Sequence, residues 1–174
     1  MNFKFKVFGL LLAGCFLCVC PSAKAQAVFS GDLIGSSTSD AAVGGIGTAP
    51  APWVVTSGSV TIQANGKWKS VIKGLVVPTL GTAQVTGIAE ALVCGGTIVA
   101  NTPGVTLDSN GNAKIKATVT GIPSRCAAPA VIIYVTEFQG MSFTLPGTQF
   151  IGLSGFTTSA GAEEHSPLEH MGKQ

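Results

Sequence analysis

Residues 60–73 read VTIQANGKWKSVIK, and residues 105–118 read VTLDSNGNAKIKAT. Each segment alternates apolar and polar side chains, passes through an Asn-Gly pair, and then alternates again. Alternation with a period of two is typical of a half-buried strand, and Asn-Gly between two such runs is a strong hairpin signal. The two segments therefore predict two antiparallel hairpins.

The apolar pattern also predicts the register of the first hairpin. A three-residue loop, Ala64–Gly66, pairs Ile62 with Trp68 and Val60 with Ser70, so that Trp68 joins the apolar face. A two-residue turn would pair Ile62 with a lysine. Because a slip of one residue moves every side chain to the other face, the three-residue loop is favoured, with its glycine in the left-handed conformation.

The second hairpin is expected to have the same geometry. Its apolar face would be formed by residues of both strands, namely Val105, Leu107, Ala113, Ile115 and Ala117.

Further strands are predicted on both sides of these hairpins. Apolar runs at 131–136 and 149–153 favour strands, and 142–145 is a weaker candidate. Residues 84–94 match both helical and strand spacing, and Gly87 within them favours a strand with a bulge. Short strands at this density, separated by Gly and Pro, predict an all-β, antiparallel β-sandwich that is immunoglobulin-like in general architecture.

The chain divides into four expected parts. Residues 1–25 are expected to be a signal peptide, and residues 26–52 to hold a first strand at 28–35 followed by a flexible Gly/Ser/Ala/Pro-rich segment. Residues 53–156 are expected to form the sandwich. Residues 157–174 are expected to be a disordered polar tail.

The expected leader has the usual features of a secretory signal. Lys4 and Lys6 give a positive start, Val7–Cys20 is an apolar run too short to span a bilayer, and Ala23–Ala25 is a small-x-small cleavage site. Cleavage after Ala25 predicts a secreted, periplasmic or extracellular protein with no transmembrane segment. An alternative stays open, because residues 12–15, LAGC, resemble a lipobox, which would make the chain a lipoprotein anchored through Cys15.

Removal of the leader also changes the charge and the cysteine count. Ten Lys and Arg become seven, against eight Asp and Glu, so the net charge changes from +2 to −1. Nucleic-acid binding normally needs a basic excess and is not expected. Only Cys94 and Cys126 remain, and in an oxidising compartment they most simply form a disulfide.

Strand, turn and cysteine residues occur together at 92–96 (LVCGG), 111–113 (GNA), 123–126 (PSRC) with Pro129, and 131–133 (VII). Over roughly residues 53–136, the chain resembles on these residues a group of uncharacterised secreted bacterial β-sandwich proteins with a single disulfide. The resemblance implies the same fold and compartment, and it implies no catalytic role.

No recognisable catalytic set is present in the expected folded body. Residues 28–156 contain no histidine, which removes the commonest hydrolase designs, and no phosphate-binding glycine loop or cofactor motif is found. We therefore expect a non-enzymatic module with a structural or binding role, and no cofactor. His165 and His170, with nearby glutamates, could chelate a metal, although a solvated tail is the favoured interpretation.

The alternative enzyme is a small carbohydrate-active hydrolase that uses Glu90 and Glu137. Such chemistry needs two carboxyl groups about 5–10 Å apart in a cleft. The favoured interpretation of Glu90 is a strand-surface residue or an ion pair with Arg125 or a lysine. Asp108, which precedes Asn-Gly, is interpreted as a turn residue.

Two groups of residues are candidates for a ligand surface. If the two hairpins are neighbours, their lysines share one face and could bind an anionic glycan or another cell-envelope polymer, although an ordinary solvated face is favoured. Trp53 could be an exposed platform for sugars, although a packed aromatic residue is favoured. The candidate residues are Trp53, Lys67, Lys69, Lys73, Lys114 and Lys116.

Overall fold

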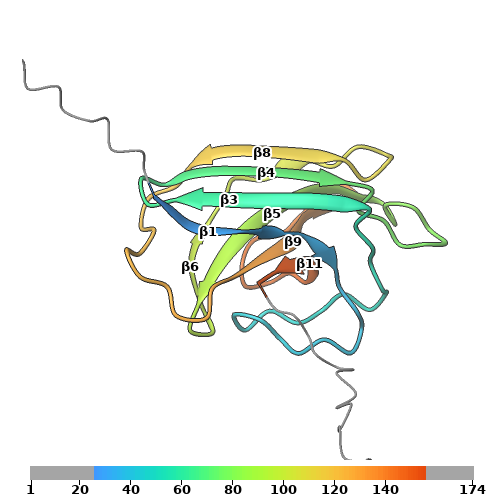
Figure 1. Ribbon diagram of the computed structural model, residues 1–174. Helices are drawn as coiled ribbons and strands as arrows, with labels where there is room; N and C mark the ends of the chain where they lie inside the picture. Colours follow the sequence, from blue (N-terminus) through green and yellow to red (C-terminus); the bar gives the residue numbers. More distant parts are fainter. Residues whose placement is uncertain (1–25, 156–174) are drawn as a thin grey trace, which may run out of the picture.

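The computed structural model describes residues 26–155, in which two antiparallel sheets pack face to face (Figure 1). The strands are β1 (Ala27–Asp32), β2 (Ile34–Gly35), β3 (Ser57–Gln63), β4 (Lys67–Lys73), β5 (Val85–Cys94), β6 (Thr97–Asn101), β7 (Val105–Thr106), β8 (Ala113–Thr118), β9 (Ala130–Phe138), β10 (Met141–Ser142) and β11 (Phe150–Ser154). The predicted all-β antiparallel sandwich is confirmed.

One sheet has four strands, in the order β1-β3-β4-β8, and forms the upper layer in Figure 1. The other has the order β2-β11-β9-β5-β6, with β10 added beside β9 and β7 beside β5. Within the described residues, no helix is long and apolar enough to cross a bilayer. The predictions of a signal peptide, of a lipobox at Cys15 and of a polar tail with its histidines concern residues outside this range.

The predicted register of the first hairpin is confirmed. β3 pairs with β4 so that Ile62 lies opposite Trp68 and Val60 lies opposite Ser70. The loop closes through a hydrogen bond from the Gly66 amide to the Gln63 carbonyl (2.9 Å), and Gly66 has a φ of 82°.

The prediction of a second hairpin is wrong. β7 pairs with β5 in the larger sheet, whereas β8 pairs with β4 in the smaller one, so the Asn-Gly turn carries the chain from one sheet to the other. Leu107 and Ile115 are both buried in the core between the sheets. Alternation reports which face of a strand is buried, and two strands that face the same core from opposite sheets give the same pattern as a hairpin.

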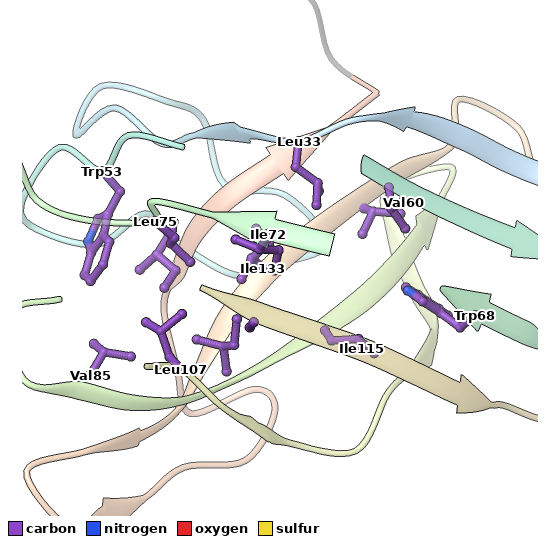
Figure 2. Packing of buried hydrophobic residues seen from close by; sticks show 14 of the residues in the cluster. Leu33, Trp53, Val60, Trp68, Ile72, Leu75, Val85, Leu107, Ile115 and Ile133 are labelled. Carbon is purple, nitrogen blue, oxygen red and sulfur yellow. The ribbon is translucent and has the colours of Figure 1, made fainter. Parts of the chain in front are cut away.

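The main core lies between the two sheets (Figure 2). Trp68, Ile72 and Ile115 project into it from the smaller sheet, and Ile88 and Ile133 project from the larger one. Burial of these side chains, all at most 1% exposed, supplies the main driving force for folding.

The larger sheet is buried on its second face as well. There Ala89, Ile132 and Phe150 form a second cluster with Ile46 from the segment that precedes β3. A strand covered on both sides needs apolar residues at consecutive positions, which explains why residues 84–94 do not alternate cleanly. The predicted strand with a bulge is confirmed, because the register of β5 against β9 shifts on both sides of Gly87.

The segment 36–52 differs from the expected flexible linker. The amide of Ala49 donates to the carbonyl of Phe150, the amide of Phe150 donates to the carbonyl of Gly47 (both 3.0 Å), and Ile46 is 1% exposed. The folded body therefore begins at β1 and not near Trp53. The small residues of this segment are typical of a flexible linker. In the structure they allow the chain to lie close against the larger sheet.

The disulfide between Cys94 and Cys126 is confirmed, with 5.1 Å between the Cα atoms. It joins the end of β5 to the connection between β8 and β9. The amide of Gly95 also donates to the carbonyl of Ala127 (2.7 Å). The connection that returns the chain to the larger sheet is thus attached to that sheet before β9 begins.

Replacement of Gly66 by alanine is expected to destabilise the protein by about 2–3 kcal/mol. The added Cβ would collide with the carbonyl oxygen of Val119 at a position with positive φ. Gly45→Ala is the matched control, since Gly45 also has positive φ (80°) but has open space around it. Urea unfolding of both variants isolates the collision, and equal losses in the two would contradict it.

Candidate functional site

Five lysines lie together on the outer face of the smaller sheet. Lys67, Lys69 and Lys73 occupy three of the four exposed positions of β4, with Val71 at the other, and Lys114 and Lys116 occupy exposed positions of β8. We call these five residues the lysine face. The alternation that buries Trp68, Ser70 and Ile72 inward is the reason that the lysines all point outward.

The lysines are close because β4 and β8 are adjacent. Lys69 lies directly opposite Lys116, and Lys114 lies opposite Val71. Like charges directly across a strand pair are destabilising, so the arrangement opposes stability instead of adding to it. β8 is also an edge strand of this sheet, and lysines on an edge discourage pairing with another chain.

The rest of this outer face is neutral or weakly polar. β3 contributes Ser59 and Thr61 beside β4, and Ser30 of β1 lies beside Thr61. The acidic side chain on this sheet, Asp32, is on β1, at the opposite edge from β8. The five lysines therefore form a positive strip along one side of the sheet.

Trp53 is not an exposed platform for sugars. Its side chain is 5% exposed and belongs to the main core, near Leu75 and Val85 (Figure 2). The alternative interpretation, a packed aromatic residue, is confirmed. The amide of Trp53 donates to the carbonyl of Ser36, the residue that follows β2 (2.8 Å).

The interpretation of Glu90 as a surface or ion-paired residue is wrong. Glu90 is fully buried between the sheets, and its hydrogen-bond partners are neutral. Trp68 Nε1 donates to Oε2 and Ser70 Oγ lies at hydrogen-bond distance from Oε1, each at 2.6 Å. The backbone amide of Glu90 donates to Thr102 Oγ1 (3.0 Å).

Burial raises the pKa of Glu90 to about 7, against the opposing effect of the hydrogen bonds from Ser70 and Trp68. When Glu90 is a neutral acid, the hydrogen bonds among Glu90, Ser70 and Ser59 can all form. Ser70 Oγ also lies 3.1 Å from the carbonyl of Ser59, and one hydroxyl proton cannot serve two acceptors. With Glu90 protonated, its O–H donates to Ser70, and Ser70 donates to Ser59.

The structure does not bring Glu90 and Glu137 together. Glu90 lies opposite Ile133 on β9, four residues from Glu137, which corresponds to about 13 Å along the strand. Glu137 is exposed, whereas Glu90 has no access to solvent. A glycosidase pair needs both groups in one cleft at a shorter separation.

Asp108 is a turn residue, as predicted. Its Oδ1 accepts the amides of Asn110 (2.9 Å) and Asn112 (2.8 Å), and Oδ2 accepts from the Asn112 side chain (3.0 Å). These hydrogen bonds lower the pKa of Asp108. In residues 26–155 no group of three His, Cys, Asp or Glu side chains is placed to hold a metal ion.

Two features were missed in the sequence. One is the polar group around Glu90 and the other is an apolar pocket beside Trp53. The apolar neighbours of Glu90 indicated partial burial, but its partners lie on β4 and after β6, at sequence distances that no local pattern spans. The pocket depends on loops whose Gly, Pro and Ala residues indicate turns and nothing more.

The chain matches no protein-family model, no curated protein and no solved structure.

Proposed function

We propose that the chain is an exported, non-enzymatic β-sandwich module that binds an anionic polymer, such as a carboxylate- or phosphate-bearing glycan of the cell envelope, through its lysine face. The observation that carries the proposal is the adjacency of β4 and β8, which gathers five exposed lysines on one side of one sheet.

The charge distribution supports this proposal. Five of the six Lys and Arg residues within 26–155 are in the lysine face, although the chain without its leader has a net charge of −1. The pair of Lys69 and Lys116 is repulsive and so does not stabilise the sheet. A bound polyanion would turn the repulsion into attraction and release counterions.

The sheet geometry suits an extended polymer. Alternate residues of one strand are about 6.6 Å apart, and adjacent strands are about 4.8 Å apart. Lys67 and Lys69 follow one line at this spacing, Lys73 lies on the same line beyond Val71 at about twice the spacing, and Lys114 and Lys116 follow a parallel line beside it. Charges in two short rows contact several units of a linear polyanion at once, which gives avidity without a deep cleft.

Removal of single charges tests the proposal. We expect Lys69→Gln to elute from an anionic resin at clearly lower salt than the unchanged protein, because it removes a central charge of the lysine face. The control is Arg125→Gln, which makes the same change of net charge at a residue that belongs to neither β4 nor β8. Equal shifts for the two variants would show that net charge alone determines retention, and would contradict the proposal.

A further inference from the structure

A pocket opens at one end of the sandwich, apart from the lysine face. It has a volume of about 680 Å³, and none of the residues lining it belongs to β4 or β8. Small-molecule sites commonly have volumes of about 300–1,000 Å³ and mostly apolar linings. The pocket therefore has the size of a ligand site.

The pocket has a buried floor and an open mouth. The floor is formed by Trp53, Val85 and Ile151, which belong to the main core. The exposed residues Pro50, Pro146 and Gly147 line its outer part. A molecule held here would contact core side chains at one end and water at the other.

The lining selects an uncharged ligand. None of the residues that line the pocket is Asp, Glu, Lys, Arg or His. The hydroxyl of Thr148 is already used, because it donates to the carbonyl of Val135 (2.6 Å). Gln149, which is exposed, and the indole N–H of Trp53 are the remaining side-chain polar groups of the lining. A charged group inside would lose its hydration without gaining a partner.

Two further observations single out this end of the molecule. Ala83, which lines the pocket, has a φ of 48°, and its neighbour Gln84 has a φ of 68°. Gln139, hydrogen-bonded through its side chain to Gln84, has a φ of 52°. Such conformations are unfavourable for residues with a Cβ and tend to gather at ligand sites.

Large apolar side chains are also exposed on the segments that line the pocket. Leu80, 66% exposed, lies in the turn between Val77 and Ala83, and Met141, 53% exposed, lies between Phe138 and Phe143. Val77, Ala83, Phe138 and Phe143 all line the pocket.

We propose that this pocket binds the hydrocarbon chain of an uncharged amphiphile, with the chain against Trp53 and the polar head at the mouth beside Gln149. The site is independent of the lysine face, so it adds a second ligand to the proposed function.

Binding of 1-hexanol, 1-octanol and 1-decanol to the purified protein tests this proposal by calorimetry. Each added methylene that enters an apolar site tightens binding about fourfold, so octanol is expected to bind about 16-fold more tightly than hexanol. The tryptophan emission of the protein is expected to change on binding, and this change is expected to be smaller in Trp53→Phe, in which only Trp68 emits. Affinities that do not depend on chain length would overturn the proposal.

Variants that fill the pocket supply the second arm. Gly147→Leu and Ala51→Leu, at two separate positions of the lining, are expected to weaken octanol binding at least tenfold. Ala42→Leu is the matched control, because Ala42 is exposed and lies outside this pocket. Thermal unfolding identifies a variant that does not fold. If one of the two leucine variants does not fold, the octanol affinity of the other one tests the proposal. Unchanged binding in a folded, filled variant would overturn the proposal.

Salt separates this site from the lysine face. Octanol affinity is expected to stay unchanged between low and high salt, whereas retention by the lysine face falls with salt. Loss of octanol binding in Lys69→Gln would contradict the independence of the two sites.

Discussion

Raising the pH from 4.5 to 8 is expected to lower the free energy of unfolding by about 3 kcal/mol through Glu90 alone. The pKa of Glu90 is about 7 in the folded protein and 4.5 for an unperturbed glutamate. Between these values the unfolded chain releases the proton while the folded protein keeps it. The stabilisation is therefore complete below pH 4.5, decreases as pH rises to about 7, and is lost above it.

Glu90→Gln isolates this contribution. Glutamine keeps the shape of the neutral acid, and its side-chain amide can accept from Trp68 and donate to Ser70, the two partners of Glu90. We expect urea unfolding to give the Glu90→Gln variant a free energy of unfolding equal to or below that of the unchanged protein at pH 4.5. At pH 8.5 we expect the variant to have the larger free energy of unfolding. Glu137→Gln is the control, since Glu137 is exposed. Parallel pH profiles for the Glu90→Gln variant and the unchanged protein would contradict the buried neutral acid.

Removal of the disulfide is expected to lower the free energy of unfolding by about 3.5–4 kcal/mol. The bond closes a loop with a sequence separation of 32, and its loss lets the unfolded chain adopt many more conformations. The double variant Cys94→Ala/Cys126→Ala avoids free thiols, and urea unfolding measures the loss. Unchanged protein in reductant supplies a control with both sulfurs present.

The position of the disulfide adds a structural consequence. Cys126 lies in the connection from β8 to β9, so the bond attaches the chain that crosses between the sheets to the end of β5. Relative to the unchanged protein, we expect amide hydrogen exchange in the double variant to accelerate more around Gly95 and Ala127 than at Ile62 and Trp68. A loss of stability below about 1 kcal/mol would show that the connection is held without the bond.

The alternating segments predicted secondary structure better than they predicted partners. The register of Ile62 and Trp68 could be derived because one loop joins their strands and only one loop length buries the tryptophan. The partner of β7 could not be derived, because Leu107, which directly follows β7, is buried in the same core whether β7 pairs with β8 or with β5. The apolar pattern of a strand shows which of its faces is buried. It does not show which strand is its neighbour, because that depends on contacts between residues that are distant in sequence.

The same limit applies to the candidate site. Lysines at alternate positions already indicated an exposed face, and the adjacency of β4 and β8 needed the structure. Glu90 looked like a surface residue because charged side chains are seldom fully buried. Its burial depends on Trp68 and Ser70, which reach it from β4, and on Thr102, which follows β6. Residues 36–52 were predicted to be flexible from their composition, and composition carries no information about the hydrogen bonds that this segment makes with Phe150.

The salt dependence of binding to a linear polyanion tests the proposed function most directly. With long-chain polyphosphate as the probe and the purified protein, the logarithm of the affinity is expected to fall against the logarithm of the salt concentration with a slope of about −3.5, as for roughly five contacts with a single-stranded polyanion. Replacing all five lysines of the lysine face by glutamine is expected to bring the slope close to zero, while replacing them by arginine is expected to preserve it. No binding at low salt, or a slope that the five glutamines leave unchanged, would contradict a binding role for this face.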